Sequence, residues 1–322
     1  MIINVLMLIA GLGLLVKGAD WFVDGSSGIA QKLGIPELVI GLTIVAMGTS
    51  LPEAAVSIAA ALKGTAGIAV GNVVGSNIIN VLIILGVTAL ITRVAIQKST
   101  LMIELPFMLV ITVVLLITGM SGNVINRWEG VLFWGLFLVY LGYLFLLAKR
   151  GSSAETEISA AEETVPQPGK KRGSIYKYII LIVVGGIMVV AGSNIAVDGA
   201  VGIARAFGLS ERFIGLTIVA LGTSLPELMT SVTAARKGNA GIAIGNIVGS
   251  NIFNILFVLG TTALICDVPF QPMFRIDALA AIGAGVLLWL GTLRKKELRR
   301  PCGFLMIAGY TVYFCYLMGI IG

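Results

Sequence analysis

Two glutamates, Glu53 and Glu227, lie inside stretches of sequence that are otherwise apolar enough to cross a membrane. Each ends the hexapeptide GTSLPE, which occupies residues 48–53 and again 222–227. A carboxylate at membrane depth is costly, so it is expected to face the protein interior and to serve a function there. The same residue type at the same place in two copies makes a purely structural role less probable than it would be for either glutamate alone.

The proline of each hexapeptide predicts a break in the helix that carries it. Pro52 lacks the N–H that would bond the carbonyl of Gly48, and its ring crowds that carbonyl. In lipid, the loosened carbonyls must find another partner, and a cation is one such partner. Helical spacing puts hydroxyls, carbonyls and the carboxylate on one face. The residues on this face are Ala46, Thr49, Ser50 and Glu53 in the first copy and Ala220, Thr223, Ser224 and Glu227 in the second.

A second motif follows each hexapeptide and adds amide oxygens. It reads GNVVGSNIIN at 71–80 and GNIVGSNIFN at 245–254. Its glycines, four residues apart, would let another backbone approach closely. Oxygen ligands of these kinds suit hard cations such as Na⁺ and Ca²⁺. The predicted polar stripes are Asn72, Ser76 and Asn80 on one helix and Asn246, Ser250 and Asn254 on the other.

The two motifs belong to one long internal repeat. Residues 39–91 align with 213–265 without a gap, and about 37 of the 53 aligned positions carry the same residue. If each half of the chain crosses the membrane five times, the two copies must enter it in opposite directions. Inverted repeats of this kind are typical of secondary transporters, whose site lies near the midplane where the repeats meet.

The composition identifies the class of protein in which these motifs sit. Of the 322 residues, 57% are hydrophobic and only 12% are charged, and the mean hydropathy is +1.02. Such a chain is a polytopic membrane protein. The net charge of +6 does not indicate nucleic acid, because the basic residues sit in short loops between apolar runs. The absence of histidine excludes imidazole-bound metals and Ser-His-Asp chemistry, and three cysteines without motif spacing do not predict a disulfide framework.

We expect an all-α fold of ten transmembrane helices, because a span needs about 20 apolar residues. Residues 1–148 and 175–322 would form the two five-helix repeats, and the polar segment 149–174 a flexible cytoplasmic loop. About sixteen Lys and Arg fall on one side and about five on the other, which places both termini outside. The predicted spans are 2–27, 36–62, 67–91, 100–118, 127–148, 175–202, 209–235, 241–265, 273–293 and 302–321.

The paired motifs resemble the α-repeats of the sodium/calcium exchanger family, within the cation/calcium antiporter superfamily. The motifs cover about a third of the chain, and the ten-helix layout with a central loop is similar over nearly all of it. The resemblance implies a secondary antiporter, not an enzyme, that exchanges Na⁺ for Ca²⁺ by alternating access. We expect it in the cytoplasmic membrane of a prokaryote.

The resemblance also implies which residues bind the ions. For Ca²⁺ it implies the carboxylates of Glu53 and Glu227 with the backbone carbonyls of Thr49 and Thr223. For Na⁺ it implies sites around the same two glutamates that draw on Ala46, Ser50, Ser76, Ala220, Ser224 and Ser250. Asn80 and Asn254 would stand at the centre of the cluster.

The chain departs from part of the family at those two central positions, where one of the residues is an aspartate. With Asn80 and Asn254 both neutral, the charge of the site cannot be more negative than −2. This leaves open the Na⁺ stoichiometry and coupling to K⁺ or H⁺. A Ca²⁺/H⁺ or K⁺-dependent antiporter of the same fold and, less favoured, a cation channel are the alternatives. Ca²⁺ and Na⁺ would be transported ions, with no organic cofactor. We expect membrane lipid around a functional monomer that needs neither nucleic acid nor a protein partner.

Other charged residues favour structural roles. Lys17 and Asp20 are spaced to pair on the first helix, and Asp24 lies near its cytoplasmic end. Glu104 is expected to snorkel or form an ion pair near a helix end. The helices predicted at 2–27 and 175–202 lack the repeated motifs and contain long glycine-bearing runs, so we expect them to form the moving pair of a carrier.

Overall fold

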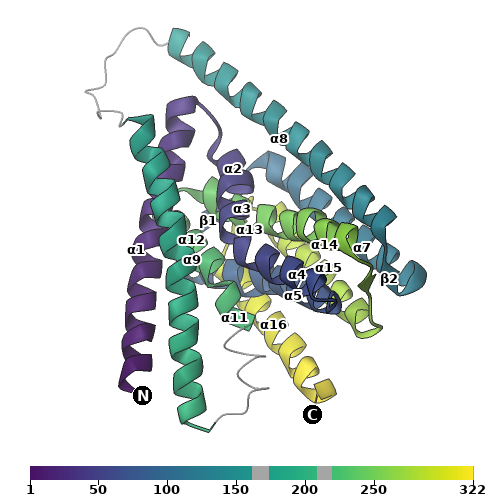
Figure 1. The fold of residues 1–322 in the computed structure, drawn as a ribbon. Helices are drawn as coiled ribbons and strands as arrows, with labels where there is room; N and C mark the ends of the chain where they lie inside the picture. The colour runs from purple at the N-terminus through teal and green to yellow at the C-terminus, as the bar shows by residue number, and fades with distance from the viewer. Residues whose placement is uncertain (162–173, 209–219, 322) are drawn as a thin grey trace.

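Helices form nearly all of the regular structure in the computed structural model, which describes residues 1–161, 174–208 and 220–321 (Figure 1). Within these ranges, seven helices are long and apolar enough to cross a membrane, and one bent pair would make eight. The polytopic helical membrane fold is therefore confirmed. The count of ten spans, the inverted repeat and the placement of the termini stay predictions.

The helix that carries the first GTSLPE motif is broken where the proline predicts. It consists of α2 (Glu37–Ile40), the π-helical segment η1 (Gly41–Val45), α3 (Ala46–Thr49) and α4 (Leu51–Leu62). The two parts meet at an angle of 49°. Ser50 lies at the break with φ −88° and ψ 10°, and Pro52 sits in the first turn of α4, where its missing N–H costs nothing.

The second copy breaks in the same way over its described part. The short helix α11 (Ala220–Thr223) leads to Ser224, with φ −91° and ψ 5°, and then to α12 (Leu225–Arg236). The rest of the span predicted at 209–235 lies outside the described residues as far as 219.

The helices that carry the second motif form the buried centre of the molecule. One runs through α5 (Gly67–Ile79), η2 (Asn80–Leu85) and α6 (Gly86–Ile91), and its counterpart through α13 (Ala240–Phe253), η5 (Asn254–Leu259) and α14 (Gly260–Ile265). Both switch from α- to π-helical hydrogen bonding at the asparagine that ends the motif. Single π-helical turns inside longer helices are frequent at functional sites.

The remaining helices surround this centre. They are η3 (Thr100–Glu104) with α7 (Leu105–Gly122), α8 (Arg127–Ala161), α15 (Met273–Leu293) and α16 (Arg300–Ile321). The first part of the segment predicted as a flexible loop, 149–161, is helical, because α8 continues to Ala161. The stretch AETEISAA at 154–161 is rich in alanine and glutamate, which favour helix, although it is too polar to read as a span. The rest of the predicted loop, 162–173, lies outside the described residues.

Two short antiparallel strand pairs tie the loops of the two halves together. β1 (Val94–Ala95) pairs with β4 (Glu297–Leu298), and β2 (Val124–Ile125) pairs with β3 (Val268–Pro269). The first pair joins two loops predicted to be cytoplasmic, and the second joins two loops predicted to be outside. The pairing is therefore the one that the predicted topology requires.

Helix α1 (Ile2–Leu33) and α9 (Ile175–Ala206) pack against each other along much of their length, at one side of the bundle (Figure 1). Glycines seven residues apart make this approach possible. A Cβ on Gly11, Gly18 or Gly25 would lie within 2.8 Å of an atom of α9. The glycines on the facing stripe of α9 are Gly185, Gly192 and Gly199.

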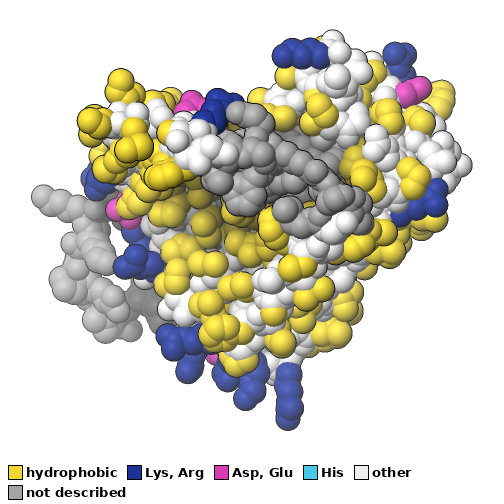
Figure 2. All heavy atoms as spheres, turned by 90° about the horizontal axis from the view of Figure 1, so that it is seen from below, with side chains coloured by type: hydrophobic (Ala, Val, Ile, Leu, Met, Phe, Trp, Pro, Cys, Tyr) yellow, Lys and Arg dark blue, Asp and Glu magenta, His cyan; other side chains and the backbone are white. Residues whose placement is uncertain are grey.

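The outer surface is apolar, as a lipid-facing surface must be. Large apolar side chains such as Trp128, Val139 and Val312 are well exposed. In the space-filling view, apolar side chains predominate and Lys and Arg lie toward the edges of the face (Figure 2). The polar side chains are instead concentrated in the interior, around the two repeated motifs.

Candidate cation site

The two glutamates of the repeat occupy equivalent places at the start of two helices. Glu53 lies in the first turn of α4 and Glu227 in the first turn of α12, and each is only 1% exposed. The free N–H groups of a helix start stabilise negative charge, which favours a carboxylate at this position. Burial of the side chains and their place at the breaks agree with the sequence prediction.

Side chains from one copy contact the other copy at the two breaks. Ser50 Oγ donates a hydrogen bond of 2.9 Å to Glu227 Oε1. Ser250 Oγ donates one of 3.3 Å to the carbonyl of Ala46. Glu53 and Glu227 are also close enough for their charges to interact. The two motifs therefore converge on one buried cluster, as the sequence predicts.

Asn72 and Asn246, the first asparagines of the two GN(V/I)VGSN motifs, hydrogen-bond to the helices that begin at the breaks. Asn72 Nδ2 donates to the carbonyl of Glu53 at 3.1 Å and to Ser57 Oγ at 2.9 Å. Asn246 repeats both bonds, to the carbonyl of Glu227 at 3.3 Å and to Ser231 Oγ at 2.9 Å. These bonds fix the helix starts on which the glutamates stand.

Thr49 adds a further link between the copies. Its Oγ1 lies 3.0 Å from Asn246 Oδ1, and it also lies 3.1 Å from the carbonyl of Val45 in its own helix. The threonine hydroxyl is thus engaged with protein atoms, and its backbone carbonyl is the atom that the family resemblance implies as a Ca²⁺ ligand.

Several buried oxygens of the cluster lack a hydrogen-bond partner within the described part of the chain: Glu53 Oε2, Glu227 Oε2, Asn80 Oδ1, Asn254 Oδ1 and Ser224 Oγ. Leaving a buried acceptor unsatisfied costs about 1–3 kcal/mol, and more for a charged group. A hard cation would satisfy several of them at once. Among the described residues, no three Asp, Glu, Cys or His side chains are placed so that they could hold one metal ion. The candidate donor set therefore consists of two carboxylates and neutral oxygens.

The other predicted site residues are placed less fully. Ser76 lies beside the Glu53 carboxyl, and Ala46 and Ser250 are buried. Thr223 is half-buried at the end of α11. Ala220 is the first residue of α11, and the structure describes its backbone only. The structure thus brings the predicted residues to the two breaks, while their assignment to particular ions stays a prediction.

Sequence reasoning missed Asn77 and Asn251. Both are buried and hydrogen-bonded to each other's backbone and to the two central asparagines. They fall between the i, i+4 positions of the predicted polar stripe, so the stripe did not include them. Their recurrence in both copies of GSN was the available signal.

Glycines allow the broken helix of the first copy to cross α13. A Cβ on Gly245 would lie 2.8 Å from the carbonyl of Leu38 and 2.9 Å from Gly41 Cα. One on Gly249 would lie 2.7 Å from the carbonyl of Leu42. This close crossing confirms the predicted role of the second glycine pair. The matching crossing in the other copy involves residues 213–219, outside the described ranges.

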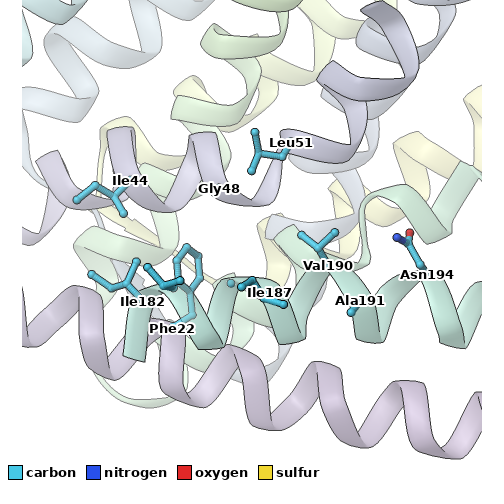
Figure 3. A pocket seen from close by; sticks show the side chains of 11 residues that line it. Phe22, Ile44, Gly48, Leu51, Ile182, Ile187, Val190, Ala191 and Asn194 are labelled. Carbon is cyan, nitrogen blue, oxygen red and sulfur yellow. The ribbon is translucent and has the colours of Figure 1, made fainter. Parts of the chain in front are cut away.

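Two apolar cavities flank the breaks at equivalent positions of the two copies. The larger, about 500 Å³, lies between α9 and the first break (Figure 3). The smaller is about 210 Å³. The lining residues of the two cavities are related by the sequence offset that separates the two GTSLPE motifs. The related pairs are Phe22 and Ala196, Gly48 and Gly222, Leu51 and Leu225, Ile182 and Leu8, and Gly186 and Leu12.

The two aspartates of α1, Asp20 and Asp24, have a different basic partner from the one that their spacing suggests. Asp20 and Asp24 both pair with Lys237, at 3.1 and 2.8 Å, and not with Lys17, which lies 5.7 Å from the centre of the Trp21 ring. The prediction of a Lys17–Asp20 pair is therefore wrong, because the turn between α12 and α13 brings a closer cation.

Glu104 is also not a snorkelling side chain. It is buried at the junction of η3 and α7, and it accepts a hydrogen bond from the Tyr143 hydroxyl. The expectation of an ion pair or an interfacial position is wrong. A tyrosine on the neighbouring span supplies the polar partner that burial requires.

Fold and site together define an integral membrane protein with a buried cluster of oxygen atoms, contributed by two repeated motifs, that is a candidate cation site. A sequence model of the family described as "Sodium/calcium exchanger protein" matches residues 3–146 and 177–319. The chain belongs to the sodium/calcium exchanger family, which consists of secondary transporters and not enzymes.

The chain is similar over nearly its whole length to curated relatives and to a solved structure. The chain is 36% identical to the Inner membrane protein YrbG of Escherichia coli, over 98% of this chain and 97% of that one. It is 35% identical to the Sodium/calcium exchanger MaX1 of Methanosarcina acetivorans, over 99% of both. A solved structure of the sodium-calcium exchanger NCX_Mj, soaked with Na⁺ and Ca²⁺, superposes with a TM-score of 0.83 at 32% identity, covering 98% of each chain.

Proposed function

We propose that the protein is a secondary antiporter that exchanges Na⁺ for Ca²⁺ across the cytoplasmic membrane of a prokaryote by alternating access. The observation that carries the proposal is the hydrogen bond from Ser50 to Glu227, which joins the break of one copy to the carboxylate of the other. A site shared between two oppositely oriented copies is the arrangement that a carrier requires.

The assignment of ligands to ions is part of the proposal. Ca²⁺ would bind between Glu53 and Glu227 with the carbonyls of Thr49 and Thr223. Na⁺ would use the surrounding hydroxyls and carbonyls. The unsatisfied oxygens of both carboxylates support this, because they are buried acceptors in need of a positive partner.

The charge of the site favours electrogenic exchange. Two ionised glutamates carry −2, which one Ca²⁺ neutralises and three Na⁺ would exceed by one. Exchange of three Na⁺ for one Ca²⁺ would move one net charge per cycle. Each charge moved couples transport to the membrane potential by about 2.3 kcal/mol per 100 mV.

Alternating access is supported by the two unequal cavities. Both lie between a break and the α1–α9 pair, at positions related by the repeat. We propose that α1 and α9 move together against the rest of the molecule, and that the two cavities exchange sizes as they do. The continuous glycine contact between α1 and α9 is consistent with motion as one unit.

Flux in proteoliposomes tests the proposal. Vesicles loaded with Na⁺ and diluted into choline buffer should take up ⁴⁵Ca²⁺, and a valinomycin-imposed K⁺ potential should change the rate if the exchange is electrogenic. Glu53→Gln and Glu227→Gln should each reduce uptake to background, because one charge cannot balance Ca²⁺. Glu104→Gln is the matched control, a buried membrane glutamate away from the cluster, and should retain uptake.

The alternatives differ in what drives the flux. Uptake that ignores Na⁺ but follows a pH gradient in Na⁺-free buffer would replace the proposal with Ca²⁺/H⁺ antiport. A requirement for K⁺ together with Na⁺ would indicate the K⁺-dependent form. Flux without any counter-ion would indicate a channel.

A further inference from the structure

We infer that Asn77 and Asn251 are positioning residues that orient the amides of Asn80 and Asn254, so that the two central side chains offer oxygen and not N–H₂ to the transported cation. The inference deepens the proposed function, since it concerns how that cation site is assembled. It rests on four hydrogen bonds that cross between the copies.

The orientation of the Asn251 amide follows from a backbone contact. Asn251 Nδ2 lies 3.3 Å from the carbonyl oxygen of Asn77. A carbonyl oxygen only accepts hydrogen bonds, so the atom facing it must be the amide nitrogen. The other end of the Asn251 amide is therefore its oxygen.

That oxygen in turn determines the orientation of Asn80. Asn251 Oδ1 lies 2.9 Å from Asn80 and can only accept, so Asn80 must present Nδ2 to it. The amide of Asn80 is planar, and its Oδ1 points away from this contact. This Oδ1 is buried and has no hydrogen-bond partner within the described residues.

The second copy repeats the same chain of contacts. Asn77 Nδ2 donates to the carbonyl of Asn251 at 3.1 Å, and Asn77 Oδ1 accepts from Asn254 Nδ2 at 3.1 Å. Asn254 Oδ1 is likewise buried without a partner in the described part of the chain. Each central amide is thus held by an asparagine of the opposite copy.

Both freed oxygens belong to segments that pack against a glutamate-bearing helix. Asn80 begins η2, which contacts α12, the helix of Glu227, and Asn254 begins η5, which contacts α4, the helix of Glu53. A cation bound by either carboxylate is attracted to an amide oxygen and repelled by an amide N–H₂. Rotation of either central amide would place two acceptor oxygens against each other, so the inter-copy bonds oppose it.

A double-mutant cycle on ⁴⁵Ca²⁺ binding tests this inference in purified protein. Asn251→Leu removes the acceptor that orients Asn80, so we expect the Ca²⁺ dissociation constant to rise by about tenfold. In the Asn80→Ala background the same substitution should have little further effect, because the amide it orients is gone. Asn77→Leu should show the same dependence on Asn254→Ala. Asn251→Asp keeps an acceptor for Asn80 and should weaken binding less than Asn251→Leu.

The maximal ⁴⁵Ca²⁺ bound per protein should stay unchanged in the single variants, which separates orientation from loss of folded protein. Additive losses in the Asn251/Asn80 and Asn77/Asn254 cycles would overturn the inference, and so would Asn251→Leu binding Ca²⁺ as wild type does. If Asn251→Leu does not fold, the Ca²⁺ dissociation constants of the Asn77/Asn254 cycle and of Asn251→Asp test the same inference. Intact Ca²⁺ binding without Na⁺-driven uptake would reject the exchange function alone, whereas wild-type protein that binds neither Ca²⁺ nor ²²Na⁺ would overturn both.

Discussion

Ser50 lies at the helix break of the first copy and hydrogen-bonds to the buried carboxylate of the second copy. It lies at the bend between α3 and α4, outside regular helix, and this position turns its hydroxyl toward the other copy. There it supplies a hydrogen bond to the Glu227 carboxylate. Its counterpart Ser224 has no such bond in the described structure. The two copies thus contribute unequally to the site in this conformation.

We expect Ser50→Ala to weaken cation binding by about tenfold. A hydrogen bond to a charged group is worth about 1.5–3 kcal/mol, and 1.4 kcal/mol corresponds to a factor of ten. The measurement is the Ca²⁺ concentration for half-maximal Na⁺-driven uptake. Ser50→Thr keeps the hydroxyl and should remain close to wild type. Equal half-maximal concentrations for Ser50→Ala and wild type would show that the bond does not order Glu227 for binding.

The sequence singled out the acidic and hydroxyl residues of the candidate site because a polar side chain is unusual in an apolar span. It did not predict Asn77 and Asn251, whose importance lies in contacts between copies that no spacing along one helix reveals. Glu104 shows the same limit. Its partner Tyr143 lies 39 positions further along the chain, and only the packing of two spans brings them together.

At the scale of elements, the glycine stripes of α1 and α9 determine how closely these two helices approach. A Cβ on Gly18 would lie 2.7–2.9 Å from Met188, Val189 and Gly185, of which two contacts are backbone atoms that cannot swing aside. Gly13, on the same helix, has open space at the corresponding position. The pair provides a matched comparison within one element.

We expect Gly18→Ala to destabilise the protein by about 1–3 kcal/mol, the usual cost of overpacking. Gly13→Ala should be neutral or slightly stabilising, because alanine is the better helix former by about 1 kcal/mol. Thermal unfolding of the purified protein in detergent measures both. A Gly18→Ala variant as stable as Gly13→Ala would mean that α1 and α9 separate easily.

Lys237 links α1 to the turn between α12 and α13. Burial lowers the pKa of Lys237, but the hydrogen bonds and charges of Asp24 and Asp20 outweigh this and raise the pKa above its usual value. The lysine is therefore charged at neutral pH, and the contribution of the pair to stability is complete there. It would be lost only as the pH rises through the elevated lysine pKa.

We expect Lys237→Met to lower the stability at neutral pH by less than about 1 kcal/mol, since the partners are partly exposed to solvent. The difference from wild type should vanish in about 1 M choline chloride, where charges are screened over about 3 Å. Thermal unfolding at low and high salt checks this. A loss that persists at high salt would assign Lys237 a packing role instead.

At the scale of the whole molecule, the hydropathy pattern was sufficient for the class of fold, because spans in lipid must be long and apolar. The break in the second span was also predictable, since a proline removes a definite hydrogen bond. The π-helical segments at Asn80 and Asn254 were not, because both segments are apolar runs with ordinary helical composition. The extension of α8 to Ala161 was missed because hydropathy locates spans and not the helix that continues beyond them.

The arrangement of the chain ends supports the predicted orientation. Both ends lie at the same end of the bundle, and α8 ends and α9 begins at the opposite end (Figure 1). The strand pair β1–β4 joins loops that contain Arg93, Lys98 and Lys296, whereas the loops joined by β2–β3 are flanked by Arg127 and Arg275 alone. The positive-inside bias then favours the cytoplasm for the loops joined by β1–β4 and the outside for the chain ends.

Reporter fusions in a bacterial host test this orientation. Alkaline phosphatase is active only outside the cytoplasm, so its fusion after Gly322 should be active, and a fusion after Ser152 should be inactive. Green fluorescent protein exported in unfolded form does not fluoresce outside, so its fusions at the same two positions should give the opposite pattern. Because the reporters fail on opposite sides, a poorly expressed fusion is distinguished from a misplaced one. Phosphatase activity after Ser152 but not after Gly322 would contradict the predicted orientation and place both chain ends in the cytoplasm.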